Sequence, residues 1–299
     1  METIDLRKRD VDNLKLYDLN NDIFNSESKI YVLSEGKWNK PGELFKYLFI
    51  RSHSTFANKL FTVSMLNDHR KLLDEDTFII PDKFVSIDNK ISGFTIPLIE
   101  NNTNLATILN SLDVNPEEKI KYLNELGNIL KKLGELKIQG MDLSFGDLHE
   151  CNFIINHDND DKLCAVDLDS AYMHTGYPQA SHYLVTNPYI NQIEGKYHAN
   201  QFGINIPDKN SDLFCYNMII LNTIAHAKIS NLNMNDYYMY VNYLESLGFG
   251  EDLIESFKAL YDTVDNINPS DFLDEINIDR LPEANLGVFK YKKKHNKLK

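Results

Sequence analysis

Short runs of alternating apolar and polar residues dominate the first hundred positions, and this pattern is typical of half-buried strands. The runs are LKLYDL at 14–19, SKIYVLSEG at 28–36, ELFKYLFI at 43–50, and KFVSIDNKISGFTIPLI at 83–99, whose central Asp-Asn-Lys predicts a hairpin. Residues 54–73 instead place Phe56, Leu60, Val63 and Leu66 at helical spacing. We therefore predict a small antiparallel sheet with one helix.

From residue 101 onward the apolar positions follow a helical period. The clearest helix spans 115–140, where Asn115 suits the N-cap, Pro116 the first turn and Gly140 the C-terminal end. Further helices are expected at 211–226, 234–248, 251–264 and 269–276. A strand-rich first third followed by helices predicts an α+β fold with two unequal lobes and a cleft between them.

The predicted lobes give the domain boundaries. Residues 1–100 form the sheet lobe and residues 101–285 the helical lobe. The segment 286–299 ends in KYKKKHNKLK and is expected to be a frayed basic tail.

Composition excludes several classes of protein. The chain of 299 residues has a net charge of −13, which argues against a general nucleic-acid binder. No apolar run approaches the ~20 residues that span a bilayer, so no membrane partner is expected. The three cysteines show no C-x-x-C spacing, which favours reduced thiols and a cytoplasmic location. The oligomeric state is left open.

Two polar motifs carry the candidate chemistry. SFGDLHECNFIIN at 144–156 places Asp147 and Asn152 five residues apart, and KLCAVDLDS at 162–170 brings Asp167 after an apolar run. The intervening HDNDDK turn predicts a hairpin that returns Asp167 toward Asn152. A carboxylate and an amide oxygen together suit Mg²⁺. The alternative is a solvated turn that is simply rich in Asp and Asn.

GDLHECN followed by AVDLD resembles the catalytic and metal loops of the protein-kinase-like superfamily. The match is to a divergent bacterial or phage Ser/Thr protein-kinase-like domain. The resemblance implies a two-lobed kinase fold that uses ATP and Mg²⁺. It implies that Asp147 orients the attacking hydroxyl, and that Asn152 and Asp167 bind the metal.

The resemblance extends over residues 15–275. It implies that Lys46 of the third strand binds the phosphates, although a lysine on the solvent face of an edge strand is the alternative. It also implies that adenine meets Ile96, the carbonyl of Pro97 and the N–H of Ile99. Asp212 is expected to hold the catalytic-loop backbone, or else to be a first-turn acid favoured by the helix dipole. VTNPYINQIE at 185–194 resembles the end of an activation segment, with Thr186 and Glu194.

Several positions depart from the family pattern. NNDIFNSES at 20–28 lacks the glycines of the nucleotide-covering loop, and the first helix lacks a Glu for Lys46, with Asp68 its nearest acid. Gly146 stands where an Arg is usual. Asp169 replaces the glycine of the metal loop, where it is a second metal acid or a turn cap.

These features predict transfer of a phosphoryl group from ATP to a hydroxyl, with Ser or Thr of a protein favoured. Gly146-Asp147-Leu148-His149 is closer to aminoglycoside- and choline-type kinases, so a small-molecule phosphotransferase is the first alternative. His149 would then contact the γ-phosphate, or instead bridge loop groups. A non-catalytic pseudokinase scaffold is the second alternative.

Overall fold

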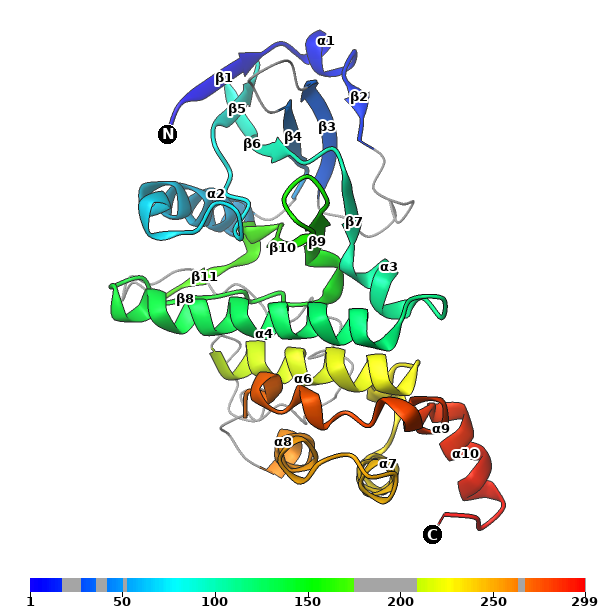
Figure 1. Cartoon of the computed structure of the whole chain (residues 1–299). Coiled ribbons are helices and arrows are strands. Elements are labelled where there is room, and N and C mark those ends of the chain that lie inside the picture. The colour runs from blue at the N-terminus through cyan, green and yellow to red at the C-terminus, as the bar shows by residue number, and fades with distance from the viewer. Residues whose placement is uncertain (18–27, 36–41, 51–52, 175–208, 263–266, 299) are drawn as a thin grey trace. The chain divides into compact units, whose positions relative to one another are not determined.

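The computed structural model describes residues 1–17, 28–35, 42–50, 53–174, 209–262 and 267–298. The chain divides into two compact units (Figure 1). The first consists of Met1–Thr103 together with the segment that begins at Ile154. The second contains Asn104–Phe153 and the C-terminal helices. The sequence assigns the segment after Ile154 to the helical lobe, whereas its contacts group it with the sheet.

The described part of the first unit contains a six-stranded sheet in the order β1-β5-β6-β4-β3-β2. Its strands are β1 (Thr3–Leu6), β2 (Lys15–Leu16), β3 (Ser28–Ser34), β4 (Gly42–Leu48), β5 (Phe84–Ile87) and β6 (Lys90–Leu98). The predicted hairpin is β5–β6, and its turn residues Asp88 and Asn89 have positive φ, which Asp and Asn tolerate well.

The expectation of a purely antiparallel sheet is wrong at one edge. β1 pairs with β5 in parallel, and the other described pairs are antiparallel, so the sheet is mixed. A parallel neighbour cannot come from a tight hairpin, and here the partner strands lie about eighty residues apart in the chain. The alternation in Thr3–Leu6 is too short to identify this strand from the sequence alone.

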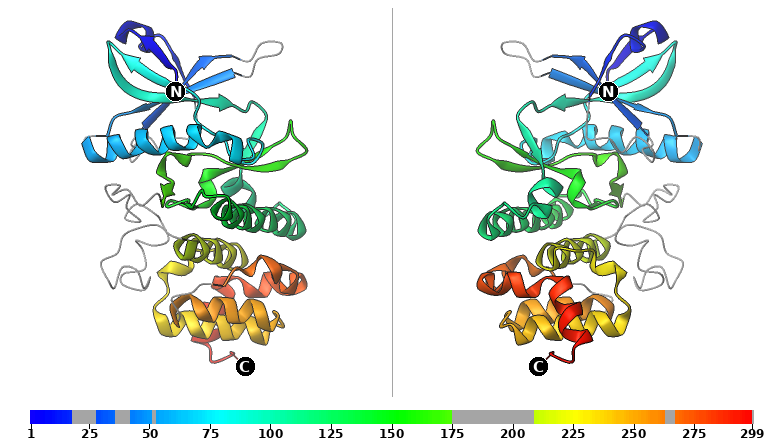
Figure 2. Two further views of the ribbon diagram at one scale, coloured as in Figure 1. Left: turned by 90° about the vertical axis from the view of Figure 1, so that its left-hand side faces the viewer. Right: turned by 90° about the vertical axis from the view of Figure 1, so that its right-hand side faces the viewer.

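The two faces of the sheet are covered by different elements. Helix α2 (His53–Asp68) packs against one face, where Val63 contacts the cluster containing Leu48 and Phe94 (Figures 1 and 2). The other face carries Phe45 and Val85, which pack with Val11 of the short helix α1 (Lys8–Val11). Lys46 therefore faces α2 rather than solvent, because alternate residues of a strand point to opposite faces.

A small sheet connects the later segment to the first unit. Its order is β10 (Lys162–Ala165), β9 (Phe153–Asn156) and β7 (Asn102–Asn104). Ala165 exchanges backbone hydrogen bonds with the chain at Thr77 and Ile79, at 2.7 and 2.9 Å. Ile79 also packs with Cys164 and Ile154 in one apolar cluster. These contacts explain why the segment after Ile154 belongs to the first unit.

The second unit is built from helices. They are α3 (Leu105–Asn110), α4 (Pro116–Ile138), α6 (Lys209–Ala225), α7 (Met234–Ser246), α8 (Glu251–Asp262), α9 (Leu281–Ala284) and α10 (Leu286–Lys294). α4 and α6 lie side by side (Figures 1 and 2), and Tyr216 donates a hydrogen bond to the carbonyl of Leu123 at 2.8 Å. Asn115 caps α4 as predicted. The helix expected at 269–276 is instead two 3₁₀ turns, Pro269–Asp271 and Leu273–Glu275.

The expected basic tail is an anchored helix. In α10, Phe289 is fully buried and contacts the rings of Tyr240 and Tyr243, with centroids 5.3 and 5.6 Å away. Leu286 is also buried. The lysines concealed this amphipathic pattern because they dominate the composition of the segment. Burial of one aromatic ring is enough to fix a short helix against its neighbours.

No helix in the described part of the chain is both long enough and apolar enough to cross a membrane.

Anchoring of α10 gives the first prediction. We expect Phe289→Ala to lower the free energy of unfolding by about 3–5 kcal/mol, because it removes a buried ring and leaves a cavity. Urea denaturation followed by circular dichroism measures the change. Tyr291→Ala is the matched control: Tyr291 is 56% exposed on the same helix, and its loss should cost no more than about 0.5 kcal/mol. Equal effects of the two variants would contradict a docked α10.

Candidate functional site

Lys46 is buried in the middle of β4, with only 6% of its surface exposed. It lies opposite Phe94 of β6, and its ammonium group is 5.9 Å from the centre of that ring. Gly93 allows the backbones of β6 and β4 to lie close together at this point, since a Cβ there would clash with the carbonyl oxygen of Lys46. The alternative of a solvent-facing edge lysine is therefore excluded.

Asp167 is the main partner of Lys46. β10 ends at Ala165, and two residues later Asp167 adopts a left-handed conformation with φ of 61° and ψ of 38°. An ion pair joins the Lys46 ammonium to the Asp167 carboxylate. Asp167 keeps 39% of its side chain exposed, so it also faces solvent. Aspartate tolerates this left-handed conformation, which directs the Asp167 carboxylate toward Lys46.

Asp169 lies in the following 3₁₀ turn, Leu168–Ser170, and is completely enclosed. Its Oδ1 accepts from Lys46 at 2.7 Å, and its Oδ2 accepts from Lys59 of α2 at 3.0 Å. Both carboxylate oxygens are therefore used by ammonium groups. The sequence suggested Asp169 as a metal ligand or a turn cap. With its oxygens placed in this way, we no longer expect it to bind the metal.

The pKa values of this cluster reflect its dense packing. Burial by itself would lower the pKa of Lys46, but Asp167 and Asp169 outweigh burial and hold it above its ordinary value. Burial would raise the pKa of Asp169, yet Lys46 and Lys59 hold it well below the usual range. Partial burial and the neighbouring Asp169 charge raise the pKa of Asp167 above its ordinary value. The carboxylate that faces solvent is thus the one that is easier to protonate.

In the second unit, Asp212 holds the loop that carries Asp147. Asp212 lies in the first turn of α6 and is buried, with 3% of its surface exposed. Its two oxygens accept from the backbone N–H groups of Phe145 at 2.8 Å and Gly146 at 3.3 Å. Gly146 has a φ of 72°, which suits glycine. The expectation that Asp212 holds the loop backbone is confirmed.

Asp147 and Asn152 are connected within this loop. The side-chain nitrogen of Asn152 donates to the backbone carbonyl of Asp147 at 2.9 Å. This bond uses the amide nitrogen, so the amide oxygen is the atom with which Asn152 can bind a cation. Asp147 Oδ1 is buried and has no hydrogen-bond partner among the described residues. An unpartnered buried carboxylate oxygen is costly, and such atoms often serve a substrate or ion.

His149 lies beside Asp147, with 3.7 Å between His149 Nε2 and Asp147 Oδ2. Burial would lower the pKa of His149, but its hydrogen bonds to Asp147 and to the exposed Cys151 raise it to about 10. The Asp147 carboxylate thus favours the protonated, cationic form of the His149 ring, and both side chains belong to the same loop.

The residues expected to bind adenine lie at the end of β6. Ile96 packs against the cluster around Val63, and Ile99 packs beside Ile79. The carbonyl of Ile99 accepts from the side chain of Asn102 at 2.6 Å. Pro97 pairs with Glu43 of β4. The residues are close in space, as their sequence positions require, but nothing in their contacts tests adenine binding.

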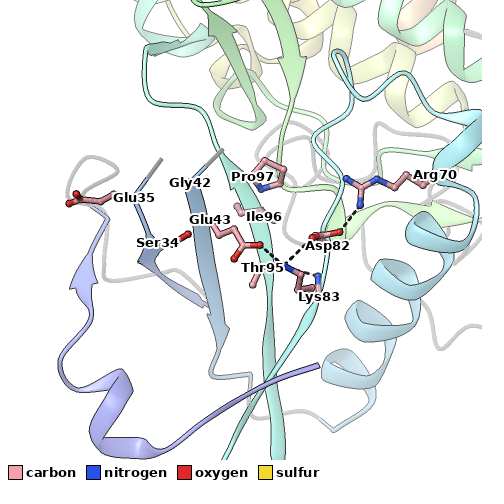
Figure 3. Close-up of a pocket in the computed structure, with 10 residues that line it drawn as sticks. All are labelled: Ser34, Glu35, Gly42, Glu43, Arg70, Asp82, Lys83, Thr95, Ile96 and Pro97. Carbon is pink, nitrogen blue, oxygen red and sulfur yellow. Dashed lines mark hydrogen bonds and ion pairs between the residues drawn. The ribbon is translucent and has the colours of Figure 1, made fainter. Parts of the chain in front are cut away.

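A cavity of about 750 Å³ opens beside this strand end (Figure 3). Ile96 and Pro97 line it, together with Ser34, Glu35, Gly42, Glu43, Arg70, Asp82, Lys83 and Thr95. Its polar wall is closed by ion pairs of Lys83 with Glu43 at 2.6 Å and of Arg70 with Asp82 at 2.8 Å. The Lys46 cluster does not line it. We therefore place the chemistry at Lys46, where the buried charges are, and not in this cavity.

The oxygen donors fit magnesium as partial ligands. Among the described residues, no group of three His, Cys, Asp or Glu side chains lies close enough to form a complete metal site. Asp167 supplies a half-exposed carboxylate in the first unit, and Asn152 supplies an amide oxygen in the second. Magnesium is commonly bound by one or two such groups plus phosphate oxygens and water. Asp167 and Asn152, each taken by itself, thus carry an oxygen of the kind that magnesium binds.

Two expected parts lie outside the described residues. They are most of the nucleotide-covering loop at 20–28 and the segment at 185–194, with Thr186 and Glu194. Among the described residues, Lys46 pairs with Asp167 and Asp169 and not with Asp68, the nearest acid of α2.

No family model matches the sequence of the chain. No curated protein matches it either.

Lys59 is the site residue that the sequence reasoning missed. A signal was present, because Lys59 shares the buried face of α2 with Thr62, Val63 and Leu66. A lysine within an apolar stripe needs a buried acid nearby, since a lone buried charge is very costly. The sequence did not reveal which acid that was, because Asp169 lies 110 positions away.

The raised pKa of His149 predicts a pH-dependent contribution to stability. The pKa is ordinarily 6.5 and rises to about 10 in the fold, so imidazolium stabilises the fold fully below about pH 6.5. This contribution is lost as the pH rises toward 10. The difference in free energy of unfolding between wild type and His149→Gln should therefore be largest near pH 6 and shrink by about pH 10, measured by urea denaturation.

An Asp147→Asn background is the control for this prediction. Without the carboxylate, the difference caused by His149→Gln should change much less between the two pH values. A difference that is independent of pH in the wild-type background would contradict the charged pair.

Proposed function

We propose that this protein transfers the γ-phosphoryl group of ATP to a hydroxyl group, using Mg²⁺. The observation that carries the proposal is the ion pair between the buried Lys46 and the exposed Asp167, which would place a phosphate-binding cation against a solvent-facing carboxylate. Phosphoryl transfer requires a cation for the phosphates, oxygen ligands for the metal, and an acid that orients the nucleophile. The two units contain one residue or more of each kind.

Lys46 would bind the phosphates of the nucleotide. Its ammonium group is fixed by two carboxylates and does not need to reorganise when the ligand arrives. Preorganised charge of this kind contributes more to catalysis than a mobile side chain does. Asp167 and Asn152 would hold the magnesium ion, which neutralises phosphate charge when it is bound.

Asp147 would orient the attacking hydroxyl and accept its proton. Its Oδ1 is the buried oxygen without a described partner, and the loop that carries it is fixed by Asp212. The other oxygen faces His149, whose positive charge holds the carboxylate in place. His149 would also stabilise the negative charge that develops on the transferred phosphoryl group. Both roles depend on position rather than on covalent chemistry.

The acceptor is proposed to be Ser or Thr of a protein. A small hydroxylated molecule is the second candidate, and the run Gly146-Asp147-Leu148-His149 favours it. The sequence resemblance for that run is closer to aminoglycoside- and choline-type kinases. A protein acceptor predicts phosphate on the chain itself or on added protein, whereas a small acceptor leaves the protein unmodified. These outcomes separate the two candidates directly.

Intact-mass analysis after incubation with ATP and Mg²⁺ tests the proposal. We expect steps of about 80 Da in the wild type, since each phosphate adds this mass. Asp147→Asn should slow the transfer by about 10²–10⁴-fold, the usual contribution of a catalytic base. Lys46→Met should slow it as well, while Lys71→Met on the exposed surface serves as the control.

Turnover of ATP with candidate sugars, amino alcohols and choline follows if no mass is added. Turnover that depends on Asp147 would then support the small-molecule candidate. Absence of any nucleotide binding and of any turnover in the wild type would contradict phosphoryl transfer and favour a non-catalytic scaffold.

A further inference from the structure

Lys59 is a buried cation on the face of α2 that also carries Thr62, Val63 and Leu66. Its side chain is 8% exposed, and its ammonium group donates to Asp169 Oδ2 and to Ser170 Oγ, both at 3.0 Å. Asp169 in turn accepts from Lys46 at 2.7 Å. The three side chains therefore form a continuous chain of charge-assisted hydrogen bonds from α2 to β4. All of these residues belong to the first unit.

Among the described residues, the cluster has equal numbers of positive and negative side chains. Two lysines, Lys46 and Lys59, face two aspartates, Asp167 and Asp169. Asp169 is the central member, because each of its oxygens is bonded to a different lysine. Without Lys59, the enclosed Asp169 would keep Lys46 alone as its described ion-pair partner, and without Asp169 two buried ammonium groups would lie close together. Removal of one partner from a buried ion pair is strongly destabilising.

Stability alone does not account for the cluster. Apolar residues of similar volume are often at least as stable as buried ion pairs. The neighbouring positions on the same helix face, Val63 and Leu66, show that apolar side chains pack well there. The ion pairs instead fix the position of the Lys46 ammonium group, because they hold it at hydrogen-bonding distance from the carboxylates.

Helix α2 also forms hydrogen bonds with the turn that carries Asp169 and with the residue that follows it. Thr62 Oγ1 donates to the carbonyl of Ala171 at 3.2 Å, one helical turn from the Lys59 contact with Ser170. The turn Leu168–Ser170 is therefore fixed by α2 at two points, and Asp169 is its enclosed residue. A displacement of α2 would move Asp169, and through it Lys46.

We propose that Lys59 is a positioning residue, which acts through Asp169 to hold Lys46 in its phosphate-binding place. The proposal rests on the proposed function, because it concerns the lysine that would bind the phosphates of ATP. Lys59 itself has no contact with the nucleotide in this assignment. Its role is to keep Asp169 aligned, so that Lys46 reaches the phosphates without a cost of reorganisation.

Binding of a non-hydrolysable ATP analogue, AMP-PNP, with Mg²⁺ tests this role by isothermal titration calorimetry. We expect Lys59→Met to weaken binding by about tenfold, the loss of one charge-assisted interaction behind Lys46. Lys59→Arg keeps the charge and should restore most of the affinity. Lys46→Met is the reference for complete loss, and the exposed Lys71→Met should bind like the wild type.

A double variant separates positioning from stability. Asp169→Asn alone leaves two buried lysines facing one aspartate, so its melting temperature should fall clearly. Adding Lys59→Met restores one lysine to one aspartate and should raise the melting temperature again. The affinity for AMP-PNP should nevertheless stay low, since Lys46 still lacks its second anchor. A merely structural role predicts that affinity and melting temperature recover together.

Different outcomes overturn different claims. Wild-type affinity in Lys59→Met, with loss in Lys46→Met, overturns the positioning role and leaves the proposed function intact. Wild-type affinity in the double variant overturns it equally, and this variant remains informative if Lys59→Met does not fold. Absence of AMP-PNP binding in the wild type overturns the proposed function and the positioning role with it.

Discussion

The ion pair between Lys46 and Asp167 is the interaction on which the arrangement of the first unit's buried charges depends. It joins β4 to the chain after β10, which lie 121 positions apart in the sequence. A lysine that is 6% exposed cannot remain in an apolar sheet without acids beside it, so this contact constrains both segments. The backbone accommodates it at Asp167, which takes a left-handed conformation to present its carboxylate.

The positions of the other buried charges follow from this constraint. The helix that packs on the sheet carries Lys59 rather than an acid, and the acid lies on the turn as Asp169. The helix thus contributes a cation and the turn an acid, and the two charges meet at 3.0 Å. Electrostatic balance depends on the sum of neighbouring charges and not on which element carries each one.

In the second unit, the main structural feature is the support of the polar loop that carries Asp147. Asp212 binds two successive N–H groups that would otherwise lack partners, and Gly146 provides the required positive φ. Aromatic packing of Phe145 against Phe153, with ring centres 5.4 Å apart, fixes both ends of the loop. Asp147 can then hold one oxygen unpartnered and buried, because the cost is borne by the surrounding hydrogen bonds and packing.

The sequence by itself determined the elements with clear periodicity and the loop motif. The 3.6-residue stripe predicted α4 and its cap at Asn115, the β5–β6 hairpin followed from alternation around Asp88 and Asn89, and the spacing in the Asp147 loop identified its polar residues. These signals are local, since each depends on residues within a few positions. Tertiary structure alone decided that β1 joins the sheet in parallel, that Phe289 anchors the lysine-rich α10, and that Lys59 meets Asp169. Each of those is a contact between distant segments, whose energy appears only once burial brings the partners together.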